Sequence, residues 1–358
     1  MPVLAIAGGT SWGIGRALTT AVLSTQHATP WTPVILSRTT SPPLWLRAVD
    51  PNLSRVKIRA VDYTSLSSLE SALKDVDTLI SVTNSYDGTQ AQIQVNLLHA
   101  AIKAGCRRFA PSQWGMGPQG YEALRSLKLV NKGVWEECLK HQDIIECARF
   151  NNGMFLNYLA NGIYDADAGP GAIKDNETKF RELREGGGYA PGFDMAGEGI
   201  PRAGDLKDGS GSFLISLSKG IAELPVTDDG RWPRITTTTL RDIGRFVSAA
   251  LDLPKWEHDM SIAGDTITMG ELLGIAEEVT GKRFEVQKLT SGDLEKQLSE
   301  LKPDQFMEAL WLEFKLMYCR DVESEGILTP IVNGLCPEVK PVSVKEYLER
   351  YWSCREQL

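Results

Sequence analysis

A glycine-rich loop between the first apolar run and the first helical pattern constrains this chain more than any other feature. Residues 3–7 are apolar, Gly9, Gly13 and Gly15 follow in a GxxxGxG spacing, and residues 14–23 have helical periodicity. A glycine loop at the first strand-to-helix turn is typical of dinucleotide-binding folds, because free N–H groups and the helix dipole there face an anion. We predict that these glycines permit a tight turn, close approach of a pyrophosphate and close helix packing. The alternative is a glycine turn without a ligand.

Apolar runs and helical patterns alternate through the first 150 residues. The expected strands cover residues 3–7, 34–36, 56–60, 78–82, 108–111 and 144–150, and the strongest amphipathic helix covers 92–103. This alternation predicts an α/β fold, namely a Rossmann-like parallel sheet with helices on both faces. Ligands of such sheets bind beyond the carboxyl ends of the strands.

The character of the sequence changes near residue 160. We therefore expect an NAD(P)-binding Rossmann domain over residues 1–160 and a smaller substrate-binding region over 161–358. Whether parts of 234–285 return to the Rossmann domain is left open. Residues 165–212 are rich in Gly, Asp, Pro and Glu, which predicts a long insert that is either functional or disordered.

Composition excludes several classes of protein. A net charge of -8 argues against a nucleic-acid binder, since phosphate contacts need clustered Lys and Arg. No apolar run is long enough to cross a bilayer, and the N-terminus enters a strand without the basic segment of a signal peptide. The six cysteines are scattered without metal spacing, so we expect reduced thiols and a cytoplasmic location.

The end of the second expected strand favours one dinucleotide. Many NAD-binding proteins have an acidic residue there for the ribose diol, whereas this chain has Arg38, which suits a 2′-phosphate. This favours NADPH as the cofactor. Asp62 and Tyr63, after the third strand, are placed to meet the adenine edge; a helix cap is an equally good interpretation.

Two further stretches, together with the glycine loop, carry a family resemblance. They are residues 104–115 (AGCRRFAPSQWG) and 149–158 (RFNNGMFLNY). The chain resembles the NmrA-like and isoflavone-reductase-like branch of atypical short-chain dehydrogenases/reductases. The resemblance covers residues 1–160 well, 234–285 and 340–352 loosely, and the insert not at all.

The resemblance implies where the chemistry lies. In reductases of this branch the nicotinamide lies near the loop that contains Ser112, and a lysine replaces the usual YxxxK pair, which this chain lacks. That lysine falls in the helix between the two motifs; Lys132 fits the branch pattern best and Lys128 is the reserve. Lys132 would hold the nicotinamide ribose and act as proton donor. Gln113 and Trp114 depart from the acidic-aromatic pair of the branch, which argues against an acid at that position.

The candidate site residues follow from these arguments. Lys132 is the expected catalytic residue. The expected cofactor-binding residues are Gly9, Thr10, Ser11, Trp12, Gly13, Ile14, Arg38, Asp62, Tyr63, Thr83, Asn84, Ser112, Lys132 and Asn151. No metal site is expected, because His99, His141 and His258 stand isolated without a metal partner at helical spacing.

The resulting hypothesis is an NADPH-dependent reductase of a small hydrophobic or aromatic secondary metabolite, with hydride transfer to an activated C=C or C=N bond. Two alternatives stay open. One is a redox-sensing regulator of the NmrA type that binds the dinucleotide and a protein partner, and the other is an isomerase or cyclase without net redox chemistry. The apolar stripe over residues 306–317 predicts core packing, with the wall of an aromatic substrate pocket as the alternative.

Overall fold

The computed structural model describes residues 1–161, 175–190 and 204–353. Its main sheet consists of β1 (Val3–Ala7), β2 (Thr32–Ser37), β3 (Lys57–Ala60), β4 (Thr78–Ser81), β5 (Arg108–Ala110) and β6 (Glu146–Cys147). All neighbours are parallel, in the order β3-β2-β1-β4-β5-β6. The strand order reverses between β1 and β4, and a crevice at such a point is where this class of sheet binds ligands. The predicted Rossmann-like sheet is confirmed.

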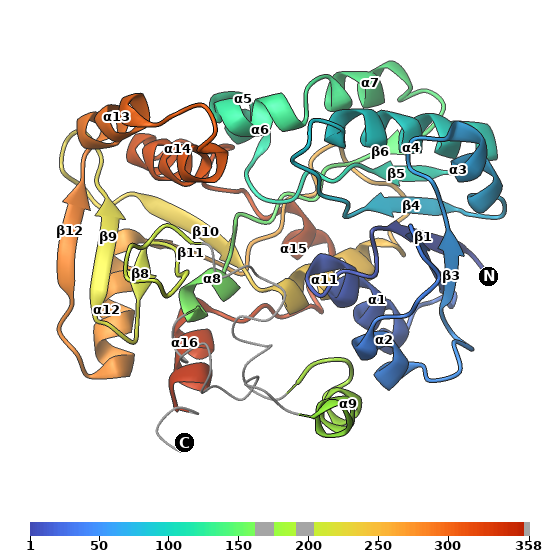
Figure 1. Ribbon diagram of the computed structural model, residues 1–358, viewed down its shortest axis with the longest axis horizontal. Helices are drawn as coiled ribbons and strands as arrows, with labels where there is room; N and C mark the ends of the chain where they lie inside the picture. Colours follow the sequence, from blue (N-terminus) through green and yellow to red (C-terminus); the bar gives the residue numbers. More distant parts are fainter. Residues whose placement is uncertain (162–174, 191–203, 354–358) are drawn as a thin grey trace.

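Helices cover both faces of this sheet (Figure 1). One layer contains α3 (Leu66–Ala72), α4 (Gln90–Ala104) and α7 (Val134–Lys140); the other contains α1 (Ile14–Ser24), α2 (Leu44–Val49), α11 (Leu240–Ala250) and α15 (Ile331–Leu335). Successive side chains of β1 alternate between the layers. Ala5 and Ala7 pack toward α3 and α4, whereas Leu4 and Ile6 pack toward α1 and α11. The run is apolar throughout because both faces are covered.

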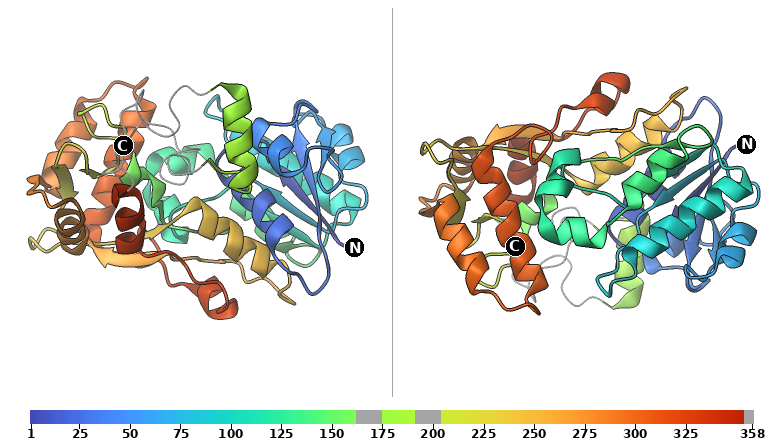
Figure 2. Two further views of the ribbon diagram at one scale, coloured as in Figure 1. Left: turned by 90° about the horizontal axis from the view of Figure 1, so that it is seen from below. Right: turned by 90° about the horizontal axis from the view of Figure 1, so that it is seen from above.

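The C-terminal half builds a second body beside the carboxyl edge of the main sheet (Figures 1 and 2). Its two small sheets contain β7 (Met154–Phe155), β10 (Arg234–Thr238) and β11 (Asp265–Thr268), and β8 (Ile215–Ser216), β9 (Ile221–Pro225) and β12 (Glu285–Leu289). Its helices, with those at the junction, are α5 (Pro118–Ala123), α6 (Arg125–Val130), α8 (Asn157–Ala160), α12 (Met269–Thr280), α13 (Ser291–Glu300), α14 (Phe306–Arg320) and α16 (Val344–Ser353). Within the described chain, no helix has the length and apolar character needed to span a membrane.

Helix α11 lies against the first helix of the main sheet although it belongs to the second half of the sequence. A Cβ atom at Gly244 would stand 2.3 Å from the carbonyl oxygen of Ala17, so the two helix backbones meet where only glycine fits. The 234–285 stretch thus contributes to the layer that covers the Rossmann sheet. The exact domain boundaries stay a prediction.

The insert contains a helix that the sequence analysis did not expect. In α9 (Asn176–Glu185) the side chain of Asp175 accepts hydrogen bonds from the backbone N–H groups of Glu177 and Thr178. Phe180 and Leu183 then pack with α2. The expectation of a structureless loop is therefore wrong for this part of the insert; residues 162–174 and 191–203 lie outside the described residues.

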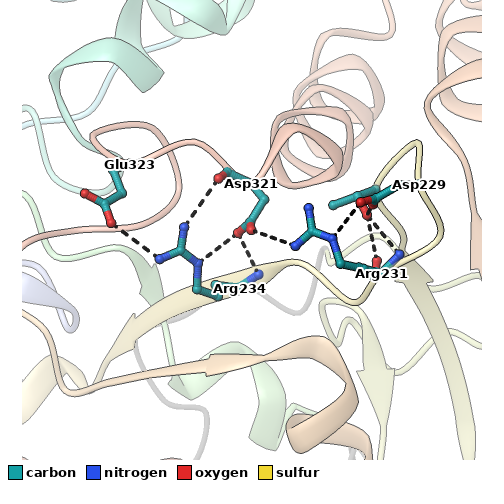
Figure 3. Close-up of polar contacts among 6 residues, drawn as sticks. Asp229, Arg231, Arg234, Asp321 and Glu323 are labelled. Carbon is teal, nitrogen blue, oxygen red and sulfur yellow. Dashed lines mark hydrogen bonds and ion pairs between the residues drawn. The ribbon is translucent and has the colours of Figure 1, made fainter.

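An ion-pair network within the second body joins the end of α14 to the start of β10 (Figure 3). Asp321, the C-cap of α14, accepts hydrogen bonds at Oδ1 from the backbone N–H of Arg234 (3.0 Å) and from its Nε (3.1 Å). Glu323 pairs with Nη1 of Arg234 at 3.4 Å, and Arg231 pairs with Asp229 at 2.7 Å. The network ties the start of β10 to α14, the helix that walls the candidate site.

Candidate functional site

The glycine loop after β1 packs as tightly as its sequence predicts. Gly8 has a φ of 77°, and a Cβ atom there would lie 3.1 Å from the backbone nitrogen of Thr83. A Cβ atom at Gly15 would lie 2.6 Å from Ser11 Oγ and 2.7 Å from the carbonyl oxygen of Gly9. Any larger residue at Gly15 would push α1 away from the loop, so the chain needs glycine here for close packing.

Four backbone N–H groups of the loop stay available to a ligand. Within the described residues, the amides of Thr10, Trp12, Gly13 and Ile14 donate no hydrogen bond, whereas that of Gly15 is already bonded to Ser11 Oγ at 3.1 Å. They surround the N-terminus of α1, where the helix dipole is positive. This arrangement fits the diphosphate of a dinucleotide.

Tyr63 and Asp62 are engaged with the protein itself. The Tyr63 hydroxyl accepts a hydrogen bond from the backbone N–H of Gly8 (2.9 Å) and donates one to the carbonyl oxygen of Leu36 (2.7 Å). Burial raises the pKa of Tyr63 to about 12. The carboxylate of Asp62 accepts from the backbone and hydroxyl of Thr64, which hold its pKa below the ordinary value. Contact of either residue with an adenine stays a prediction.

The polar residues that follow β2 and β4 differ in whether their side chains already have hydrogen-bond or ion-pair partners. Arg38 directly follows β2, is exposed and has no ion-pair or hydrogen-bond partner in the described part of the chain. Thr83 Oγ1 accepts a hydrogen bond from Gln94 Nε2 at 2.7 Å. Asn84 is exposed and donates to the hydroxyl of Tyr86 at 3.0 Å. Arg38 is therefore a cation available to a ligand at this edge of the sheet.

A cavity of about 440 Å³ extends from the glycine loop to α14. It lies at the junction of the main sheet and the second body, where α5 and α6 bridge the two (Figure 1). Its lining consists of Ser11, Trp12, Gly13, Ile14, Val82, Asn84, Tyr86, Gln90, Ser112, Trp114, Gly115, Met116, Tyr121, Leu127, Val130, Asn131, Gly153, Met154, Phe155, Tyr158, Leu240, Met307, Leu310, Trp311 and Phe314. Among the described residues, this lining contains no Asp, Glu, Lys, Arg or His, and it is mostly apolar with several aromatic side chains.

The cavity brings together only part of the predicted site. Six expected cofactor residues line it: Ser11, Trp12, Gly13, Ile14, Asn84 and Ser112. Asn151 is fully buried and not part of the lining; its Nδ2 lies 3.4 Å from Asp259 Oδ1. The apolar face of α14 lines the cavity through Met307, Leu310, Trp311 and Phe314 while also packing in the core, so both interpretations of that stripe apply.

Lys132 lies in a turn and outside the cavity lining, and its role as catalytic residue stays a prediction. The sequence analysis expected it within a helix, but Asn131, Lys132 and Gly133 form a turn between α6 and α7, and Gly133 has a φ of 74°. Lys132 is exposed and does not belong to the cavity lining. Lys128 is also exposed and pairs with Glu122 at 2.7 Å, which raises its pKa. Neither lysine reaches the cavity in this arrangement.

Two tyrosines with shifted pKa values line the cavity, and the sequence analysis did not select them. Tyr121, from α5, and Tyr158, from α8, make no hydroxyl hydrogen bond within the described residues, and burial raises the pKa of each above its ordinary value. The Tyr121 hydroxyl lies 3.9 Å from where a Cβ atom of Gly115 would stand. The sequence contains no signal for these two tyrosines, because neither is followed by a lysine four residues later as in a YxxxK pair.

Three buried polar atoms of the lining lack a partner. They are Gln90 Oε1, Asn131 Oδ1 and Trp311 Nε1. The amide nitrogen of Gln90 donates to Thr83 O (2.8 Å) and that of Asn131 donates to Leu127 O (3.2 Å), which leaves each amide oxygen as a free acceptor. Buried polar groups are normally satisfied, so these three mark positions that a ligand or water completes.

The expectation of isolated histidines is wrong for two of them. His99 and His141 both approach Glu137, at 3.0 and 3.4 Å from its Oε1 to their Nε2 atoms. His258 stands apart, with its ring against Trp135 at 5.8 Å. The Glu137–His141 spacing of four residues was visible in the sequence, whereas the approach of His99 depends on the packing of α4 on α7.

Residues 4–148 match the NmrA-like family. The chain is 28% identical over 287 residues to "Oxidoreductase BOA1" of Botryotinia fuckeliana, covering 78% of this chain and 77% of that protein. It is 24% identical to "Oxidoreductase swnN" of Metarhizium robertsii, covering 99% of each.

Solved structures with the same fold extend beyond the NmrA-like residues. An isoflavone reductase aligns with a TM-score of 0.66 at 16% identity, over 98% of this chain and 99% of that one. The NADPH-dependent quinone oxidoreductase QOR2 of Escherichia coli, solved with NADPH, aligns with a TM-score of 0.61 at 19% identity, over 96% and 98%. The second body is therefore part of the shared fold, because these alignments cover 96–98% of this chain.

Proposed function

We propose that the protein is an NADPH-dependent reductase of an uncharged, hydrophobic or aromatic small molecule. The observation that carries this proposal is the cavity, which joins the free amides of the glycine loop to aromatic side chains and has no charged side chain among its described lining residues. Concave, mostly apolar cavities of this size are typical of small-molecule sites. The names of the two curated relatives, both oxidoreductases, support the reaction class.

The chain has residues suited to both charged groups of NADPH, the diphosphate and the 2′-phosphate. The free amides at the start of α1 would hold the diphosphate, and Arg38 would pair with the 2′-phosphate that distinguishes NADPH from NADH. When bound, NADPH supplies the hydride. Ser112, whose N–H is held by Gln94 Oε1 at 2.9 Å, and Gly115 would border the nicotinamide end of the cavity.

We place the proton donor among the cavity tyrosines and not at Lys132. Tyr121 is the best placed, because its buried hydroxyl is unpaired within the described chain and lies beside Gly115. Its raised pKa keeps the phenol protonated, so it can donate a hydrogen bond to a developing oxyanion or nitrogen anion and then transfer the proton. An exposed lysine outside the lining cannot make that contact without movement of the turn.

The unpaired polar atoms at the opposite end indicate how a substrate is held. The Trp311 ring is fixed edge-to-face against Tyr158, with centroids 5.2 Å apart, and its N–H can only donate. Asn131 Oδ1 can only accept. We therefore propose that a carbonyl or imine group of the substrate accepts from Trp311 and that a hydroxyl or N–H group donates to Asn131.

The test begins with the cofactor and then follows turnover. Fluorescence titration with NADPH and NADH is expected to show tighter binding of NADPH. Oxidation of NADPH is then followed by absorbance with a panel of uncharged aromatic enones and imines, and with matched carboxylated analogues. We expect turnover of uncharged compounds and little of the carboxylated ones. NADPH binding without turnover of any compound, together with capture of a protein partner that depends on NADPH, would favour the regulator instead.

A further inference from the structure

A cluster of metal-type ligands lies on the outer side of the α4–α7 layer, away from the cavity lining. It consists of His99 on α4 and of Glu137 and His141 at the end of α7. One ring nitrogen of each histidine and a carboxylate oxygen of Glu137 lie within 4.8 Å of one another. Both rings face the same carboxylate oxygen, Oε1, at 3.0 and 3.4 Å.

These separations suit a shared ion. Zinc binds imidazole nitrogen and carboxylate oxygen at about 2.0–2.2 Å, which separates neighbouring ligands of a tetrahedral site by about 3.4 Å. The distance from His141 Nε2 to Glu137 Oε1, 3.4 Å, matches this value, and the distance from His99 Nε2, 3.0 Å, is shorter. Small side-chain rotations within the 4.8 Å limit would direct all three donor atoms at one ion. Two imidazoles with one carboxylate suit zinc, nickel, cobalt or copper better than magnesium or calcium.

The fold prepares the cluster in two ways. Glu137 and His141 stand four residues apart, so they share one face of α7 and its C-cap. The packing of α7 on α4 then adds His99 from a separate helix. The three side chains are 21–40% exposed, which lets an ion enter and lets water complete its coordination.

Lys140 competes for the same carboxylate without blocking it. Its Nζ lies 2.8 Å from Glu137 Oε2, whereas the histidines face Oε1. A bound metal ion would replace the hydrogen bonds from both histidine rings to Oε1. The positive charge of Lys140 would repel the ion.

We propose that His99, Glu137 and His141 form a site for a divalent transition-metal ion that links α7 to α4. The link bears on the cavity because α4 supports its wall. Gln90, the first residue of α4, lines the cavity, and Gln94 holds the backbone N–H of Ser112 at 2.9 Å. A bound ion would stabilise this layer, since any ligand selective for the folded state raises its stability.

Calorimetric titration of the full-length protein, free of any histidine tag and of EDTA, tests the site. With ZnCl₂ and NiCl₂ as probes we expect one saturable site and a rise in melting temperature, and with MgCl₂ neither. His99→Ala and His141→Ala should each weaken Zn²⁺ binding by about tenfold or more, because each removes one of three protein ligands. Lys140→Gln should strengthen it, because the competing cation is gone.

His258→Ala is the matched control, since this exposed histidine lies outside the cluster and should bind Zn²⁺ as the wild type does. NADPH titration of each variant confirms that it is folded. Absence of saturable Zn²⁺ binding to the wild type overturns the proposal. Equal binding by a His99→Ala/His141→Ala double variant also overturns it. Neither result depends on the proposed reductase activity.

Discussion

The hydroxyl oxygen of Tyr63 accepts a hydrogen bond from the backbone N–H of Gly8 at 2.9 Å. The same hydroxyl donates to the carbonyl oxygen of Leu36 at 2.7 Å, so one phenol joins the glycine loop to the end of β2. Those two segments would carry the diphosphate and the 2′-phosphate of the cofactor. The shape of the phosphate site therefore depends on a residue 55 positions away in the sequence.

Tyr63→Phe should destabilise the protein by about 0.5–1.5 kcal/mol, because it removes the hydrogen bonds of the hydroxyl group. The Gly8 N–H stays bonded to the Leu36 carbonyl oxygen at 3.0 Å, so neither group is left unpaired. The same change should weaken NADPH binding by loosening the loop. Urea unfolding at pH 8 measures the first effect and fluorescence titration the second. Tyr86→Phe, at a tyrosine that is 54% exposed, is the control for loss of a phenol and should leave the free energy of unfolding nearly unchanged.

The Tyr63 contribution should also depend on alkaline pH. Burial raises the pKa of Tyr63 from 10 to about 12, so the unfolded chain loses the phenolic proton at lower pH than the folded protein does. Stability from this group is complete below pH 10 and falls as the pH rises toward 12. The difference in unfolding free energy between wild type and Tyr63→Phe should be smaller at pH 11 than at pH 8; a constant difference contradicts the assignment.

The sequence predicts the first half of the fold well because its signals are local. The strand over residues 3–7 is found with those bounds, and the helix predicted over 92–103 is found as α4 (Gln90–Ala104), which ends at Gly105 in the left-handed conformation. Glycines, capping residues and apolar periodicity act within a few positions of where they stand. Helix α9 also has a local signal, the N-cap residue Asp175. The sequence analysis missed it because the surrounding residues are rich in glycine.

The candidate site was harder to predict because it depends on distant contacts. Trp311 and Tyr158 meet edge-to-face from opposite halves of the chain, and no spacing rule pairs them. The family resemblance led us to expect Lys132 within a helix. This expectation is wrong, because Gly133 has a positive φ and ends the helical conformation there, so that Lys132 lies in an exposed turn. Asn131, its neighbour, lines the cavity instead.

Arg38→Ala should raise the dissociation constant of NADPH by about 10- to 100-fold, the usual range for losing hydrogen bonds to a charged group. The affinity for NADH should stay the same, because NADH has no 2′-phosphate. Fluorescence titration of both cofactors checks the result. Lys74→Ala is the charge-matched control, since this exposed lysine precedes β4 at the opposite edge of the sheet. Equal loss for NADPH and NADH would remove Arg38 from the 2′-phosphate site.

Tyr121→Phe should lower kcat by about 100-fold or more with little change in KM, since general acids contribute about 10²–10⁴ in rate. Lys132→Ala should change kcat less than about twofold, because the side chain lies outside the cavity lining. Steady-state oxidation of NADPH by both variants distinguishes the two residues. A large loss of kcat in Lys132→Ala, with Tyr121→Phe unaffected, would restore the lysine as proton donor.

Trp311→Phe should separate stability from substrate binding. The indole N–H is buried without a partner in the described structure, so removing it deletes an unsatisfied donor while the ring contacts to Tyr158 and Phe213 largely remain. The melting temperature of the free protein should therefore stay equal or rise. KM for a carbonyl substrate should increase about three- to tenfold, because the bound substrate loses a neutral hydrogen bond. NADPH affinity should not change, since Trp311 lies at the α14 end of the cavity. A variant that loses stability and keeps its KM would show that the N–H has no role in holding the substrate.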